Sequence, residues 1–291
     1  MVKSIQKIID FLLFSNIYIG ICVAALHFAV ACKPIEALSQ LTYLLFTFFA
    51  TVSVYSLFRL RLSPESHLPS LRNLSWSVRH FAVARWVMYI AMIGAVSTFL
   101  LLDSTQKYRV ILLATLCVLY NISFFSLGSI RFDLRHIWFL KPFIVGFTIT
   151  GVVCWVPYDD TCSYSLSAFL STAAIQFSFV SALVVLFEIK DCDIDTHLHV
   201  TTIATRLGIA YTKIVALVLI LAAIVLFIIS HASICGWLLL GYLAPLLLLL
   251  IFIPLFIHSH SSEYIYWLAI DGCMIMLGLD WYLLKDYSLQ S

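Results

Sequence analysis

The chain has 291 residues, of which 63% are hydrophobic and only 11% are charged, and its formal net charge is +2. Soluble domains carry about 25% charged residues, so this composition excludes an ordinary soluble domain and predicts an integral membrane protein. Because the charges are segregated along the chain, the small net charge does not identify a partner. We expect membrane lipids and no nucleic acid as partners.

Apolar segments long enough to cross a bilayer recur along the whole chain. A spanning helix needs about 20 apolar residues, whereas a membrane barrel would show short alternating strands, so these segments predict helices. In chain order they are Ile8–Ala31, Leu38–Phe58, Phe81–Leu102, Val110–Leu127, Trp138–Trp155, Ser167–Ile189, Thr212–Ser230, Ile234–Ile257 and Tyr264–Leu284. We therefore predict an all-α fold: a polytopic membrane helical bundle of about nine transmembrane helices around a central cavity, in a single integral membrane domain, 1–291.

The basic residues are distributed unevenly between the two ends of these nine segments. One side carries 13 of the 17 Lys and Arg residues, and the other carries Lys33, Lys107, Arg109 and Lys285. Cytoplasmic loops are enriched in Lys and Arg, so we expect the N-terminus inside and the C-terminus outside. The first segment is too long for the apolar part of a cleavable signal peptide, and we expect it to be the first membrane helix.

An acidic run, Glu188-Ile189-Lys190-Asp191-Cys192-Asp193-Ile194-Asp195, ends the sixth apolar segment. On a helix, Glu188, Asp191 and Asp195 share one face within about 60°. Clustered carboxylates repel each other unless a cation lies among them, and hard cations such as Mg²⁺ prefer carboxylate oxygens. A solvated acidic helix end is the alternative. Lys190 within the run, and the scarcity of acids elsewhere, favour a binding site.

Three long connections fall on the predicted cytoplasmic side, at 59–80, 128–137 and 190–211. Long loops in a compact membrane protein tend to be functional, so we expect them to form caps over a cavity. Their basic side chains suit an anionic substrate: Arg59, Arg61, Arg131, Arg135, Lys141 and Lys190. Loop cations also arise from topology and from contacts with anionic lipid headgroups, and this alternative applies to each of them singly.

Taken together, these features resemble the UbiA-type intramembrane prenyltransferases. The family's second motif, Asp-x-x-x-Asp preceded by a basic residue, is similar to Lys190-Asp191-Cys192-Asp193-Ile194-Asp195, and Thr201, Thr202, Ala204, Arg206, Leu207 and Gly208 fit its continuation. The stretch from Leu134 to Lys141 resembles the start of the family's fifth helix, and Tyr120 fits near the end of its fourth.

The family's first motif, an Asp-rich pattern ending the second helix, is missing. The corresponding stretch, 53–65, contains no Asp, and Arg59 and Arg61 stand among the expected acids. The chain is therefore similar to a divergent member. Either its metal site is reduced, or the two arginines replace a metal in neutralising the diphosphate, or it does not perform the usual reaction.

The resemblance implies Mg²⁺-assisted transfer of an isoprenoid chain from a prenyl diphosphate to a hydrophobic acceptor, in a bacterial inner membrane, with the active site facing the cytoplasm. It implies catalytic roles for Asp191, Asp195 and Lys190, and a metal held by Glu188, Asp191 and Asp195. Diphosphate binding is expected from four basic residues: Arg59, Arg61, Arg135 and Lys141. The partners are these two substrates and membrane lipids, and the acceptor, the prenyl chain length and the oligomeric state stay open.

Three other functions remain as alternatives. A non-catalytic relative that binds a prenyl lipid is consistent with the missing first motif. A terpene-cyclising variant would use the same fold. A transporter would account for ionisable residues within helices, such as Asp10 and Asp271, although no paired repeat is evident in the sequence.

Overall fold

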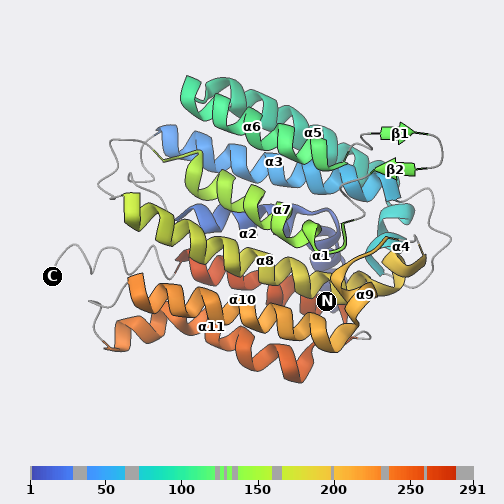
Figure 1. The fold of residues 1–291 in the computed structure, drawn as a ribbon. Coiled ribbons are helices and arrows are strands. Elements are labelled where there is room, and N and C mark those ends of the chain that lie inside the picture. Colours follow the sequence, from blue (N-terminus) through green and yellow to red (C-terminus); the bar gives the residue numbers. More distant parts are fainter. Residues whose placement is uncertain are drawn as a thin grey trace. The chain divides into compact units, whose positions relative to one another are not determined.

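Helices form almost all of the computed structural model of this chain (Figure 1), which describes residues 2–28, 38–62, 72–121, 125–127, 130–132, 137–158, 166–197, 200–230, 236–258 and 261–279. The helices are α1 (Val2–Phe14), α2 (Ile17–Phe28), α3 (Leu38–Leu62), α4 (Arg72–Arg79), α5 (Phe81–Leu101), α6 (Ser104–Asn121), α7 (Leu140–Thr150), α8 (Leu166–His197), α9 (Ile203–Leu207), α10 (Ile209–Ser230) and α11 (Gly236–Phe256). Two π-helical stretches are η3 (Gly151–Trp155) and η4 (Ile265–Ile270). The strands β1 (Phe125–Leu127) and β2 (Ile130–Phe132) pair antiparallel.

This architecture confirms the predicted all-α membrane bundle. Within the described residues, four helices are long and apolar enough to cross a membrane, namely α3, α5, α8 and α10. The bent pair formed by α1 and α2 makes a fifth candidate, and shorter apolar helices cover Leu140–Trp155, Leu243–Ile253 and Ile265–Leu279. The described residues of the nine predicted segments are mostly helical, and the chain is an integral membrane protein.

The chain divides into two compact units. The first unit comprises Met1–Asp103 with Ser262–Leu279, and the second comprises Ser104–Ser261 with Asp280–Ser291. In the first, α3 packs along α2 and α5, and in the second α8 packs along α7 and α10. The predictions of one membrane domain and of a central cavity stay predictions.

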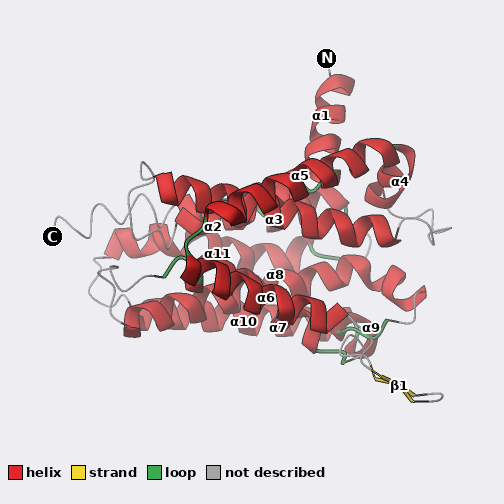
Figure 2. Cartoon of the chain, turned by 90° about the horizontal axis from the view of Figure 1, so that it is seen from above, coloured by secondary structure: helices red, strands yellow, loops and turns green. Residues whose placement is uncertain are grey.

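The first predicted span, Ile8–Ala31, consists in its described part of two helices with a sharp bend between them. The chain turns at Ser15 and Asn16, and the helices on either side are inclined at 65° to each other. Asn16 has a φ of 66°, a left-handed conformation that Asn tolerates better than most residues. Its Nδ2 donates to Ser56 Oγ on α3 at 3.0 Å, which fixes the turn. Figure 2 shows α1 running away from the direction of α2, α3 and α5.

The fourth predicted span, 110–127, is shifted. Helix α6 begins at Ser104, six residues earlier, and the last three residues of the predicted span form β1. Near the start of α6, Arg109 Nη1 donates to the carbonyl oxygen of Trp155, the last residue of η3, at 2.8 Å. A cation that binds carbonyls at a helix C-terminus satisfies groups that the helix itself leaves unpaired. Of the two strands that follow, β2 falls in the second predicted cap loop, 128–137.

Helices α7 and α8 approach each other closely at a glycine. A Cβ atom on Gly146 would lie 2.2 Å from Ser181 Oγ and 3.3 Å from its backbone nitrogen, so only glycine permits this separation. Lys141 lies in the first turn of α7, five residues before this contact. The glycine therefore helps to bring the start of α7 close to the charged end of α8.

Candidate functional site

Helix α8 carries the predicted acidic cluster on its last three turns. Its 32 residues correspond to about 48 Å of helix, whereas the hydrocarbon core of a bilayer is about 30 Å thick. One end of α8 must therefore project beyond the hydrocarbon. The apolar portion comes first in the sequence, so the charged residues after Phe187 occupy the projecting end.

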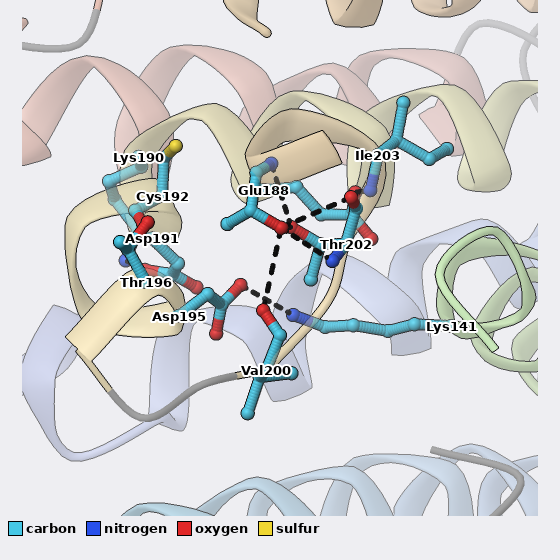
Figure 3. A network of polar contacts seen from close by, with 11 residues as sticks. Lys141, Glu188, Lys190, Asp191, Cys192, Asp195, Thr196, Val200, Thr202 and Ile203 are labelled. Atoms are coloured by element: carbon cyan, nitrogen blue, oxygen red, sulfur yellow. Dashed lines mark hydrogen bonds and ion pairs between the residues drawn. The ribbon is translucent and has the colours of Figure 1, made fainter. Parts of the chain in front are cut away.

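Glu188 is fully buried and binds the segment that follows α8. Its Oε2 accepts a hydrogen bond from the backbone nitrogen of Ile203 at 3.0 Å, and the backbone of Ala204 donates to the same carboxylate. These are the first two residues of α9, whose backbone N–H groups have no partner within the helix. Figure 3 shows the Glu188 side chain reaching from α8 to Ile203. The carboxylate thus fastens α9 to α8.

Two threonines complete the start of α9. The Thr205 backbone nitrogen donates to Thr202 Oγ1 at 3.3 Å, and the Thr202 backbone nitrogen donates to Thr205 Oγ1 at 2.8 Å. This reciprocal pattern is a capping box in which Thr205 takes the place of the usual Glu or Gln. Sequence analysis missed it because the pattern is usually sought with an acidic or amide side chain at its third position.

Asp195 and Lys141 meet across the α7–α8 contact, as Figure 3 shows. Lys141 Nζ lies 3.8 Å from Asp195 Oδ2, and Asp195 is buried. The backbone carbonyl oxygen of Asp195 also accepts from Val200 at 2.8 Å, which turns the chain back toward α9. Two predicted site residues from separate helices are therefore brought together.

Asp191 lies one turn before Asp195 and is paired with its neighbour Lys190. The distance from Lys190 Nζ to Asp191 Oδ1 is 3.1 Å, and the ammonium also lies 5.4 Å from the centre of the Phe187 ring. Lys190 is buried and Asp191 is partly exposed, whereas Asp193 is exposed on another side of the helix. The cluster thus contains three carboxylates and two ammonium groups, and Asp193 lies outside it.

A further cation lies beside the start of α7. The guanidinium of Arg206, on α9, stands 5.1 Å from the centre of the Trp138 ring, just before α7 begins. Arg on an aromatic face is held in place while its remaining N–H groups stay able to donate. Arg206 is exposed. Glu188 holds α9 in position and thereby also positions this arginine.

The carboxylates fit a metal ion only with fewer protein ligands than the sequence predicts. Within the part of the chain that the structure describes, no three His, Cys, Asp or Glu side chains are placed as ligands of one metal ion. Glu188 Oε2 accepts from the backbone of α9, whereas the buried Oε1 has no hydrogen-bond partner among the described residues. Asp191 and Asp195 each pair with a lysine in this arrangement. Mg²⁺ is commonly held by one or two carboxylates together with substrate phosphates, so these two residues suit it. The predicted role of Glu188 as a metal ligand stays a prediction.

Three other residues are predicted to bind the diphosphate: Arg59, Arg61 and Arg135. Arg59 belongs to the first unit, where its Nη1 donates to the carbonyl oxygen of Phe14 and its guanidinium lies 5.0 Å from the centre of the Trp267 ring. Helix α3 includes Arg61, but its side chain is outside the described residues, as is the whole of Arg135. The roles of all three at a diphosphate stay predictions.

Comparison with known proteins supports the fold. No family model and no curated protein matches the chain. A solved structure of digeranylgeranylglyceryl phosphate synthase has 13% sequence identity and a TM-score of 0.56, and the match covers 96% of this chain and 98% of that one. The apo structure of a UbiA homolog from Aeropyrum pernix K1 has 15% identity and a TM-score of 0.55, with 96% of each chain covered. At the level of the fold, these matches confirm the resemblance drawn from the sequence.

Proposed function

We propose that this chain is a divergent UbiA-type prenyltransferase that transfers an isoprenoid chain from a prenyl diphosphate to a hydrophobic acceptor within the membrane. The observation that carries the proposal is the Lys141–Asp195 pair, which joins two helices at the projecting end of α8 in a chain with this fold. The distribution of Lys and Arg supports placing this site on the cytoplasmic side, and we propose a bacterial inner membrane as its location.

In this proposal some side chains of the site supply positive charge, and others hold the charged groups in position. Lys141 and Lys190 supply positive charge where the departing diphosphate becomes more negative, which stabilises the transition state electrostatically. Mg²⁺ held by Asp191, Asp195 and the diphosphate oxygens would add further positive charge at the same place. Arg206 presents a planar donor fork suited to phosphate oxygens. Glu188 keeps α9, and therefore Arg206, in its place.

The reaction requires hydrophobic substrates to meet charged groups, and this explains the position of the cluster. Both the isoprenoid chain and its acceptor partition into the bilayer, whereas the diphosphate favours the aqueous boundary. A site at the point where an apolar helix leaves the hydrocarbon serves both requirements. Departure of the diphosphate leaves an allylic cation, and aromatic faces can stabilise such a cation in a site without water.

A non-catalytic prenyl-lipid-binding protein is the second candidate. It is favoured by the absence of Asp from residues 53–65 and by the two lysines that already pair with Asp191 and Asp195. Such a protein would hold a prenyl diphosphate without breaking its bond to the chain. The two candidates therefore differ in whether pyrophosphate is released.

The test is incubation of the purified full-length protein with labelled prenyl diphosphates, Mg²⁺ and candidate acceptors, with pyrophosphate release as the readout. Asp195→Asn is expected to abolish turnover, whereas Asp193→Asn, which changes an exposed acid on the same helix, is expected to retain it. Binding of the prenyl diphosphate without release over hours would support the second candidate. Full activity in Asp195→Asn would show that the site is assigned wrongly.

A further inference from the structure

Helix α1 has two different faces. Ile5, Ile8 and Leu12 are 50%, 60% and 36% exposed, and their spacing places them within about 60° of one another on the helix. Lys7 stands at least about 100° from each of these residues on the same helix, and its side chain is exposed. An amphipathic helix with lysine on its polar side and exposed aliphatic residues on the other is typical of a membrane interface.

The bend at Asn16 sets the direction of this helix. Helices α1 and α2 are inclined at 65°, so α1 lies closer to the membrane plane than to its normal if α2 crosses the bilayer. Figure 2 shows this change of direction within the first unit. Helix α2 packs along α3, a candidate membrane span, and α1 continues directly from α2, so this amphipathic helix begins at the same bilayer. The exposed aliphatic stripe is therefore next to lipid.

The C-terminal half of α1 is fixed to the first unit, so its orientation does not depend on a partner. Phe11 and Phe14 each contact the Trp76 ring of α4, with ring centres 6.3 Å apart. Asp10 accepts a hydrogen bond from the hydroxyl of Tyr264, and Leu13 is buried. These contacts hold the inner side of α1 and leave Ile5, Ile8 and Leu12 facing outward.

Further basic and aromatic side chains surround the adjoining helix ends. Arg79 and His80, at the end of α4, and Arg85, in the second turn of α5, are all exposed. Trp86 follows Arg85 and is 65% exposed. Trp is enriched where a membrane helix meets the headgroups, and basic residues there interact with anionic lipids. The first unit thus combines an apolar stripe with positive charge at this boundary.

We propose that α1 lies in the headgroup region of the bilayer as an anchoring helix, with Ile5, Ile8 and Leu12 inserted among acyl chains. In this arrangement Lys7 and Arg79 bind the headgroups of anionic phospholipids. A partner protein is the other possible occupant of an exposed apolar stripe. The bilayer is favoured because α1 is continuous with α2, which packs along the candidate span α3, and because the nearby exposed side chains are basic, which complements an anionic lipid surface.

The first experiment measures retention of anionic phospholipid by the full-length protein in native mass spectrometry, after reconstitution with phosphatidylcholine and phosphatidylglycerol. A basic residue near an anionic surface contributes about fivefold in affinity, so Lys7→Gln and Arg79→Gln are each expected to lower phosphatidylglycerol retention by roughly that factor. Lys107→Gln, a cation at the start of α6 on the other predicted side, is the matched control and is expected to change little. Equal loss in all three variants would overturn the proposal.

The second experiment identifies what covers the apolar stripe. The photoreactive residue p-benzoylphenylalanine is placed at Ile8, or at Gln6 as a control outside the stripe, and the full-length protein is irradiated in its native membrane. The Ile8 substitution is expected to give adducts with the mass of phospholipid, in higher yield than the Gln6 substitution. A protein adduct at Ile8, or equal yields at the two positions, would overturn the assignment of this surface to the bilayer.

Discussion

Replacing Glu188 separates its two possible roles. In Glu188→Ala the backbone N–H of Ile203, a residue only 2% exposed, loses its acceptor. A buried donor without a partner costs about 1–3 kcal/mol, which corresponds to an increase of about 5–150-fold in local opening of the α9 N-terminus. Glu188→Gln keeps a carbonyl oxygen at the same place, so we expect it to retain most of this protection.

Hydrogen exchange of the Ile203 and Ala204 amides in detergent measures the opening directly. Pyrophosphate release at varied Mg²⁺ provides the second readout, because a metal ligand and a structural clamp respond differently to Gln. If Glu188 is the clamp, Glu188→Gln keeps nearly normal turnover and an unchanged Mg²⁺ requirement, whereas Glu188→Ala loses turnover as α9 opens. Unchanged exchange in Glu188→Ala, or an equally raised Mg²⁺ requirement in both variants, would refute this reasoning.

Three further predictions concern packing and are checked by denaturant or thermal unfolding in detergent. Gly146→Ala should destabilise the protein by about 1–3 kcal/mol through overpacking, and adding Ser181→Ala should recover part of the loss; no recovery would contradict the close contact. Asn16→Gly should lower the free energy of unfolding by about 1 kcal/mol, because the hydrogen bond to Ser56 is lost. Asn16→Ala should lower it by about a further 1–2 kcal/mol, because alanine disfavours the left-handed backbone at this position. Equal losses in the two variants would argue against this turn. Gly278→Ala should cost more than Gly146→Ala, because its Cβ would lie 2.0 Å from a backbone carbonyl oxygen of α2 that cannot rotate away.

The arrangement of helices followed largely from the sequence because burial in a bilayer imposes a simple rule. Each apolar segment has to satisfy its backbone hydrogen bonds internally, so its length and composition predict a helix. The acidic run on α8 could also be placed, since helical periodicity aligns Asp191 with Asp195. The approach of Lys141 to this run was suggested by the family resemblance, and it depends on the glycine contact between α7 and α8.

Other features were beyond sequence reasoning because they depend on contacts between distant residues. The turn at Asn16 interrupts an apolar segment that has no Pro or charge at that point, and it is fixed by Ser56, 40 residues away. The binding of Glu188 to Ile203 requires the chain to fold back over α8, which residue spacing on a single helix does not predict. Charge and helical spacing grouped Glu188 with the other carboxylates, whereas its hydrogen bond joins it to the backbone of α9.

Helix α8 runs without interruption from its apolar portion to the charged residues at its end. Such a helix moves as one rigid rod, so the height of Asp191 and Asp195 above the hydrocarbon is set by how deeply the apolar portion sits. Bilayers differ by several Å in thickness, and a spanning helix responds by tilting or shifting. Lipid acyl-chain length therefore changes how far this end of α8, with the buried Asp195 and the partly exposed Asp191, stands above the hydrocarbon, without any change in the protein itself.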